Sequence, residues 1–287
     1  MAEAVKPPYV CHMQTHLPQR SVIRLTGPDA DSLLQGIITN DIGLLQKQPV
    51  LFSAMLTAQG KFAHDFFIFK DGEDRLIDID ASHQEAFLKK LKLYKLRAKV
   101  AFEATALQVW AAWDAAPEGG NWHADPRLAT MGWRRIAEES MEEKRREYEA
   151  HRLSLGVPDG AQDANDRHFL LELGYDQLNG VSFTKGCFVG QEPTARMHYR
   201  KVLRKGIFQV SGDAPLPEAR APIMAGEKTL GEMRSSQGNI GLAFCRMDPV
   251  QSAQTSGEPI TAGEQLIHLN IPNYMQEKWT EISAANE

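Results

Sequence analysis

The chain has 287 residues, of which 43% are hydrophobic, and carries a formal net charge of −5. This composition suffices for one large core or two modest ones, and it excludes an intrinsically disordered protein. The negative charge argues against a uniformly basic nucleic-acid-binding protein but leaves local basic patches open.

The first 205 residues combine helix and strand patterns. Apolar residues recur on one helical face after Pro28, and two aromatic and aliphatic runs are separated by the turn residues 58–61. Further segments have apolar residues at helical spacing or many opposite charges. The predicted elements are helices over 26–41, 82–95 and 138–151 and a hairpin with strands over 50–57 and 62–69.

After Lys205 the pattern changes to short β-like runs broken by Pro, Gly, Ser and Asn. The runs cover 207–210, 229–235, 240–245 and 265–271. This pattern predicts a small C-terminal β domain of about 80 residues. We therefore divide the chain into two predicted domains, 1–205 and 206–287, with the boundary near 204–206.

Cysteine and apolar patterns limit the possible sites and compartments. Cys11, Cys187 and Cys245 show no CxxC spacing, which predicts neither a disulfide framework nor a complete zinc or iron–sulfur site. No apolar run reaches the roughly 18–20 residues of a bilayer-spanning helix, and the first ten residues lack the apolar stretch of a secretory signal. We expect a soluble intracellular protein with no membrane partner and no metal site of its own.

The segment KGCFVGQE, residues 185–192, concentrates the chemically useful side chains. Gly186 and Gly190 are expected to allow positive φ or a close backbone approach, which would place Cys187 on a tight bend. Lys185 and Arg196 would favour the thiolate and make the sulfur a better nucleophile or metal ligand. The alternative is that Cys187 is a small buried apolar side chain.

Two polar residues close this segment, and a basic run follows it. Glu192 could pair with Lys185 or Arg196 and lock the loop, or contact a ligand, and Gln191 suits either role. Residues 196–205, RMHYRKVLRK, hold five Lys or Arg. They could bind a polyglutamate tail, tRNA phosphates or an acidic partner, or form a solvated strand leading into the second domain.

The segment 185–196 resembles the signature K-G-C-[FY]-x-G-Q-E-x-x-x-R of the YgfZ family of folate-binding-like proteins, with all fixed positions matched. Residues 25–42, 56–69, 125–134 and 155–160 carry the same resemblance in the family's order. Residues 171–183 resemble above all the mitochondrial iron–sulfur assembly branch. The family is similar in turn to the T-protein, the aminomethyltransferase of the glycine cleavage system.

This resemblance implies an α+β fold, with ferredoxin-like subdomains around a central cleft in a folate-binding-like domain, followed by a C-terminal β-barrel. It implies an accessory factor for assembly or repair of iron–sulfur clusters, linked to tetrahydrofolate. Folate and iron–sulfur client or assembly proteins are the expected partners, with tRNA as a further one through residues 196–205. The expected location is the cytoplasm, or the mitochondrial matrix in a eukaryote.

The resemblance also assigns site residues. Cys187 would be a transient ligand or thiol, and together with Asp65 it forms the predicted catalytic pair. The predicted cofactor-binding residues are Asp65, Lys185, Gly186, Gly190, Gln191, Glu192 and Arg196. Two alternatives remain: a tetrahydrofolate-dependent aminomethyl or methyl transferase, and a non-catalytic accessory protein for tRNA modification.

Asp65 lies inside the apolar run FAHDFFIF, where burial of an unpaired carboxylate is costly. In T-proteins an Asp at the corresponding place contacts folate near its reactive nitrogen, whereas the alternative is an outward-facing strand residue. T-proteins also carry a pterin-reading Glu where this chain has Ser154, two residues before Gly156, which argues against tight folate reading. His64 should point to the opposite face from Asp65.

The remaining histidines and cysteines are interpreted without a chemical role. His168 and His198 are expected to be packing or surface residues. Cys245, in the β-like run GLAFCRM, is expected to pack in a core, and Cys11 lies near the chain terminus.

Overall fold

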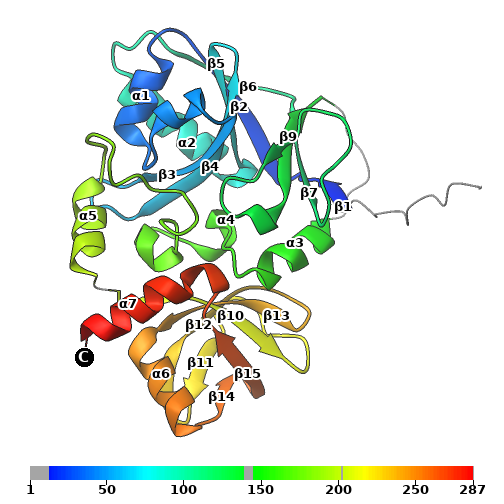
Figure 1. Ribbon diagram of the computed structural model, residues 1–287, viewed down its shortest axis with the longest axis vertical. Coiled ribbons are helices and arrows are strands. Elements are labelled where there is room, and N and C mark those ends of the chain that lie inside the picture. The colour runs from blue at the N-terminus through cyan, green and yellow to red at the C-terminus, as the bar shows by residue number, and fades with distance from the viewer. Residues whose placement is uncertain (1–12, 139–144, 202, 287) are drawn as a thin grey trace, which may run out of the picture.

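The computed structural model describes residues 13–138, 145–201 and 203–286 of the chain. Two antiparallel sheets with their helices build the N-terminal part, and a closed six-stranded barrel builds the C-terminal part (Figure 1). The predicted α+β class with a C-terminal barrel is confirmed. None of the described helices is both long and apolar enough to span a membrane.

The larger N-terminal sheet has five strands in the order β3-β4-β5-β2-β6. Its strands are β2 (Arg20–Thr26), β3 (Val50–Leu56), β4 (Phe62–Asp71), β5 (Asp74–Asp80) and β6 (Ala101–Ala104). Helices α1 (Ala30–Ile37) and α2 (Gln84–Lys95) cover one face. Leu34 and Phe87 from the helices share a buried cluster with Ile23, Phe66 and Ile77 from the sheet. The two predicted helices therefore exist, with shorter bounds.

The predicted hairpin is formed by β3 and β4. Nearly every residue of the apolar part of β4 is buried, because helices cover one face and the second core cluster covers the other. Double coverage explains why the run is continuously aromatic and aliphatic instead of alternating. Asp65, opposite Ala54, is buried within this strand.

The smaller N-terminal sheet has four strands in the order β1-β7-β9-β8. They are β1 (Met13–His16), β7 (Gln108–Trp113), β8 (His123–Ala124) and β9 (Trp133–Ala137). Val109 and Trp113 of this sheet share a core cluster with Phe52 and Phe67 of the larger one. The two sheets are therefore joined through a common apolar interior.

Connecting helices lead from this sheet to the barrel. They are α3 (Arg145–Ser154), α4 (Gly160–Asp163), the 3₁₀ turn η4 (Leu170–Leu173) and α5 (Gln191–Arg200). The other 3₁₀ turns of the N-terminal part, η1 (Ile42–Gln46), η2 (Ala81–His83) and η3 (Ala129–Met131), lie earlier, among the strands of the two sheets. The predicted helix over 138–151 overlaps α3, although residues 139–144 lie outside the described part. The first half of the basic run is helical, since α5 extends to Arg200, so the interpretation of the whole run as a strand was wrong.

The barrel closes in the order β10-β13-β12-β11-β14-β15. Its strands are β10 (Lys205–Gly212), β11 (Pro222–Ala225), β12 (Lys228–Gln237), β13 (Ile240–Arg246), β14 (Ile260–Ala262) and β15 (Gln265–Asn270). Four of them match the predicted runs, whereas the short β11 and β14 were missed.

Two helices and a turn accompany the barrel, namely α6 (Met247–Ser256), η5 (Asn273–Met275) and α7 (Gln276–Asn286), and none of them was predicted. Helix α7 lies across the barrel, next to the N-terminal part (Figure 1). Trp279 packs edge-on against Phe208 of β10, with ring centroids 5.0 Å apart. Lys278 pairs with Asp176 at 2.7 Å. The chain terminus therefore ties the two parts together.

Candidate functional site

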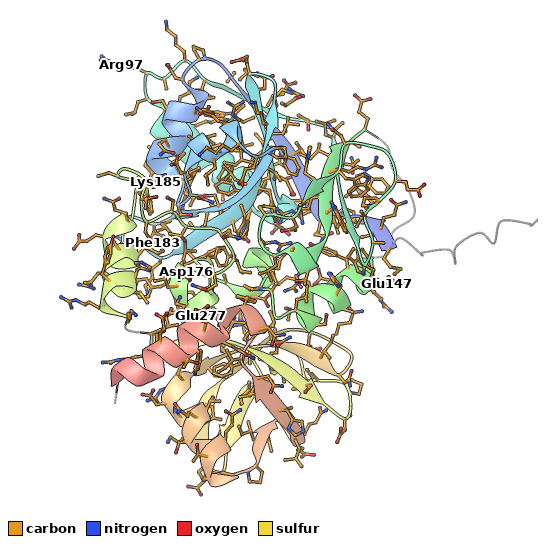
Figure 2. The ribbon with its side chains drawn as sticks, in the orientation of Figure 1. Arg97, Glu147, Asp176, Phe183, Lys185 and Glu277 are labelled. Carbon is orange, nitrogen blue, oxygen red and sulfur yellow. The ribbon has the colours of Figure 1, made fainter. Side chains whose placement is uncertain are left out.

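The motif cysteine lies in a loop between the end of α1 and the start of α5. Figure 2 places Lys185 beside α1 and Phe183 beside α5. Cys187 is exposed as a free thiol. The interpretation of Cys187 as a buried apolar residue is therefore wrong, and its sulfur is accessible to a partner.

Backbone contacts on both sides of Cys187 hold the loop in place. On one side, the Nζ of Lys185 donates to the carbonyls of Gln35 (2.8 Å), Ile38 (2.7 Å) and Asn40 (2.9 Å) at the C-terminal end of α1. On the other side, the Val189 amide donates to Gly36 at 3.1 Å. Cys187 therefore lies in a loop that is anchored two residues before it and two residues after it.

Lys185 acts on α1 as a C-terminal cap. The last carbonyls of a helix lack partners within the helix and carry partial negative charge, which favours a cation at this position. Partial burial lowers the pKa of Lys185 to about 8, while Asp41 opposes this shift. Because the ammonium group already has three backbone acceptors, its main contribution here is to loop geometry.

The two motif glycines differ in what they contribute. Gly190 has φ +79° and precedes α5, and a Cβ there would lie 2.4 Å from the carbonyl oxygen of Thr57. Gly186 has no positive φ, and a Cβ there would meet nothing within 4 Å. The expected positive φ is therefore confirmed at Gly190 and wrong at Gly186, where a close approach of the backbone to a ligand stays a prediction.

The polar end of the motif closes the loop through Gln191. Its Oε1 accepts a hydrogen bond from the Phe188 amide at 3.2 Å. Glu192 and Arg196 are exposed on α5, and within the described residues Glu192 forms no ion pair with Arg196 or Lys185. Gln191 therefore has the loop-locking role that was considered for Glu192, while Glu192 and Arg196 face solvent.

Asp65 occupies a different environment, inside the protein. Its carboxylate accepts hydrogen bonds from the Tyr175 hydroxyl at 2.8 Å and the Gly160 amide at 3.3 Å. A Cβ at Gly160 would lie 2.1 Å from the carboxylate, so a glycine is needed there. Burial, with the nearby Asp159, raises the pKa of Asp65. The interpretation of Asp65 as an outward-facing residue is wrong.

The structure does not connect the two predicted catalytic residues directly. The Cys187 thiol is exposed, the Asp65 carboxylate is buried, and no hydrogen bond among the described residues joins them. Sequence reasoning also missed Tyr175 and Gly160, which lie 110 and 95 residues from Asp65 along the chain. A shared role for Cys187 and Asp65 stays a prediction.

Comparisons with known proteins identify relatives that match most of the chain. The chain is 34% identical over 269 residues to "Iron-sulfur cluster assembly factor IBA57, mitochondrial" of Homo sapiens, a match that covers 79% of this chain and 76% of the relative. The chain belongs to the IBA57 family. The mouse protein of the same name is 31% identical over 278 residues, covering 82% of this chain and 78% of the relative.

Two further comparisons concern the IBA57-type fold. Residues 204–277 match the family model of the CAF17 C-terminal β-barrel domain. The crystal structure of glycine cleavage system aminomethyltransferase T from Bartonella henselae is similar with a TM-score of 0.71 and 12% identity, covering 92% of this chain and 86% of that one. This likeness shows a shared fold. The predicted likeness of fold to the T-protein and the predicted membership of the iron–sulfur assembly branch are confirmed.

In this IBA57-family chain, His198, His64 and Cys245 have packing roles. His198 stacks on Phe183 with centroids 3.6 Å apart, and His64 contacts His83 and Phe87 on the face opposite Asp65. Cys245 is buried, which raises the pKa of its thiol to about 12. These expectations are confirmed, whereas Cys11 lies outside the described residues.

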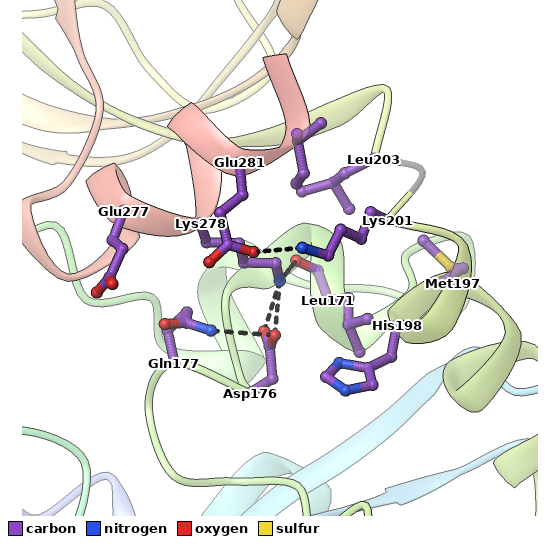
Figure 3. A pocket seen from close by; sticks show the side chains of 11 residues that line it. Leu171, Asp176, Gln177, Met197, His198, Lys201, Leu203, Glu277, Lys278 and Glu281 are labelled. Atoms are coloured by element: carbon purple, nitrogen blue, oxygen red, sulfur yellow. Dashed lines mark hydrogen bonds and ion pairs between the residues drawn. The ribbon is translucent and has the colours of Figure 1, made fainter. Parts of the chain in front are cut away.

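Helix α5 also forms one wall of a cavity of about 300 Å³ against η4 and α7 (Figure 3). Across it, Lys201 at the end of α5 pairs with Glu281 of α7 at 2.9 Å, and Lys278 reaches Asp176. The C-terminal helix thus contacts the helix that follows the cysteine motif. Within the described residues, no three His, Cys, Asp or Glu side chains gather to hold a metal ion.

Proposed function

We propose that this chain is an accessory factor for the assembly or repair of iron–sulfur clusters, and that Cys187 supplies one thiolate to a cluster in transfer. Membership of the IBA57 family supports the process. The observation that carries the role of Cys187 is its exposed thiol on an anchored loop. A fixed, accessible sulfur suits a ligand that must meet a second protein.

The number of available ligands requires such a second protein. Iron–sulfur clusters are held mainly by four cysteine thiolates. Cys187 has no further thiol beside it among the described residues, because the other cysteine there, Cys245, is buried in the barrel. The remaining ligands would come from a client or assembly protein, and the cluster is cargo that passes between the two proteins.

A complementation experiment tests this role. The Cys187→Ser variant is expressed in a strain lacking the native gene, and the activity of [4Fe-4S] enzymes is measured. We expect loss of activation, because serine keeps the shape of the loop but removes the soft thiolate ligand. Cys245→Ala is the matched control and should restore activity. Full restoration by Cys187→Ser would rule out the thiol role.

Tetrahydrofolate binding is the finer proposal, and it has support from the fold alone. The arrangement around Asp65 does not favour it, because the carboxylate is buried and already accepts bonds from Tyr175 and Gly160. Titration of wild type and Asp65→Asn with tetrahydrofolate tests it. Saturable binding that Asp65→Asn weakens would support a folate site and reopen the aminomethyl or methyl transferase alternative, whereas no saturable binding would leave an inherited fold.

The remaining proposals concern tRNA and location. A tRNA-binding role would use the exposed basic residues of 196–205, and it requires an affinity that falls as salt rises. Undetectable or salt-independent tRNA binding eliminates it. The compartment is proposed to be the cytoplasm, or the mitochondrial matrix in a eukaryote, as in the relatives named mitochondrial.

A further inference from the structure

A second cavity, of about 580 Å³, lies between the two parts of the chain. Its walls come from the β3–β4 turn, from residues 165–172 and from the barrel strands β10, β12 and β13. This volume is in the range of small-molecule sites, which lie preferentially where domains meet. The cavity is separate from the Cys187 loop, and the proposed function leaves it without a role.

Positive charge dominates the lining. Five cationic side chains face two carboxylates; the cations are Lys61, Arg167, Lys205, Arg234 and Arg246, and the carboxylates are Glu172 and Glu232. Both carboxylates have partners: Glu232 pairs with Arg234 at 2.7 Å, and Glu172 accepts from the Phe169 amide at 2.9 Å. Within the described residues, the other four cations form no ion pair, so the cavity keeps an excess of positive charge.

Two of these cations face each other directly. Lys205 of β10 and Arg246 of β13 are paired in the antiparallel register, and both are exposed. Like charges at directly opposite positions are destabilising in a sheet. An anion between the two side chains would turn this repulsion into attraction.

Arg234 adds a buried donor that lacks an acceptor. Its side chain is 7% exposed, and its Nη2 contacts Glu232 and His168. The Nε has no hydrogen-bond partner among the described residues. Burial and the neighbouring cations lower the pKa of His168 to about 4, so this imidazole is neutral at pH 7 and adds no charge of its own. A buried guanidinium N–H without an acceptor is costly and would be satisfied by an oxygen of a bound anion.

We propose that this interdomain cavity binds a small polyanion that carries phosphate or carboxylate groups. Arg234 would hold the innermost oxygen, and Lys205 and Arg246 would bind the outer charge. Phe169 and Phe244 line the same cavity and give the ligand apolar walls. Lys61 lies 3.1 Å over the Phe169 ring, which fixes one cation at the rim.

The cavity also touches the turn that supports the cysteine motif. Lys61 ends this turn, and Gly60 beside it packs on Gly190 and Pro193, since a Cβ at Gly60 would lie 2.8–2.9 Å from them. A ligand on Lys61 would therefore bind one side of the turn while the motif rests on the other.

Calorimetric titration of the full chain with pyrophosphate and, separately, with citrate tests the proposal. Wild type should bind at least one of them with a Kd below about 1 mM, weakening when NaCl rises from about 50 to about 300 mM because salt screens charge pairs. Pyrophosphate alone would indicate a phosphate ligand, and citrate alone a carboxylate ligand. Absence of saturable binding to both anions would overturn the proposal.

Charge variants locate the binding. The double variant Lys205→Gln/Arg246→Gln changes two exposed residues, so the fold should persist, and we expect at least a tenfold weaker affinity. The matched control Arg97→Gln/Lys228→Gln removes the same charge from exposed positions outside the cavity and should bind like wild type. Equal affinities for wild type and the Lys205/Arg246 variant would show that the site lies elsewhere and overturn the assignment.

Discussion

Two charged regions of the N-terminal part are built in opposite ways. In the interior, Asp78 of β5 binds Arg20 of β2 at 2.5 Å and Arg134 of β9 at 2.6 Å, with all three side chains almost fully buried. In the cysteine motif, Cys187 in the loop and Arg196 on α5 are exposed. These three interior charges are paired with one another and join the two sheets, whereas the loop holds its position through backbone contacts and leaves the Cys187 thiol exposed. Stability and accessibility are assigned to different residues.

Asp78→Asn should have the largest effect on stability. The change leaves two buried guanidinium groups without their carboxylate, and breaking a buried ion pair from one side typically costs about 3–5 kcal/mol. Denaturant unfolding measures the loss. Asp74→Asn on the same strand is the matched control. Asp74 pairs with Arg24 at 3.0 Å, and both side chains are partly exposed, so we expect the unfolding free energy to fall by only about 0–1 kcal/mol. Similar losses in both variants would contradict the comparison.

A pair of glycine substitutions separates the fixed part of the loop from its free part. Gly190→Ala forces a left-handed backbone onto alanine and a contact with Thr57, so we expect a loss of about 2–3 kcal/mol in unfolding free energy. Gly186→Ala meets open space and should change it by less than about 0.5 kcal/mol. The same unfolding assay distinguishes them, and an equal cost at both glycines would show that the loop is not anchored as described.

The elements that could be predicted from the sequence are those whose pattern is local in the chain. The hairpin, the α1 and α2 patterns and four barrel strands follow from side-chain periodicity and from turn residues. The strands β11 and β14 have four and three residues, too few to show a period, and α6 carries Pro249 near its start and no side-chain cap.

The site was predictable only in its residue types. The motif identifies Lys185 and Cys187, but the acceptors of Lys185 are backbone carbonyls as far as 150 residues away. Backbone carbonyls leave no trace in the residue pattern. The burial of Asp65 depends in the same way on Gly160 and Tyr175, which chain topology brings to β4.

The buried His64 should make the stability of the protein depend on pH. Both ring nitrogens are buried and have no hydrogen-bond partner in the part of the chain that the structure describes, and burial lowers the pKa of His64 to about 3. Because the unfolded chain takes up this proton at about pH 6.5, stability is complete above that pH and falls as pH drops toward 3. From pH 7 to pH 5 the loss from this group is about 2 kcal/mol.

The matching variant is His64→Leu, which keeps an apolar side chain against Phe87 and removes the titrating group. The decrease in unfolding free energy between pH 7 and pH 5 should be about 2 kcal/mol smaller than in wild type. His268→Gln, at an exposed position of β15, is the control and should keep the wild-type decrease. An unchanged pH dependence in His64→Leu would assign the acid sensitivity to other groups.

Cys187→Ser should have the smallest effect on stability, below about 0.5 kcal/mol, because the exposed thiol packs against no core. The thiol itself should be reactive, and a background with Cys11→Ser isolates it. There, a disulfide reagent such as Ellman's reagent should modify one thiol in the native protein and a second, Cys245, only after unfolding, since Cys245 is buried in the barrel. Adding Cys187→Ser should abolish the native reaction and leave the unfolding curve unchanged. If one thiol of the native protein still reacted after this substitution, the barrel would have to open and expose Cys245. The conclusion that the loop thiol is accessible and the barrel thiol is protected would then be wrong.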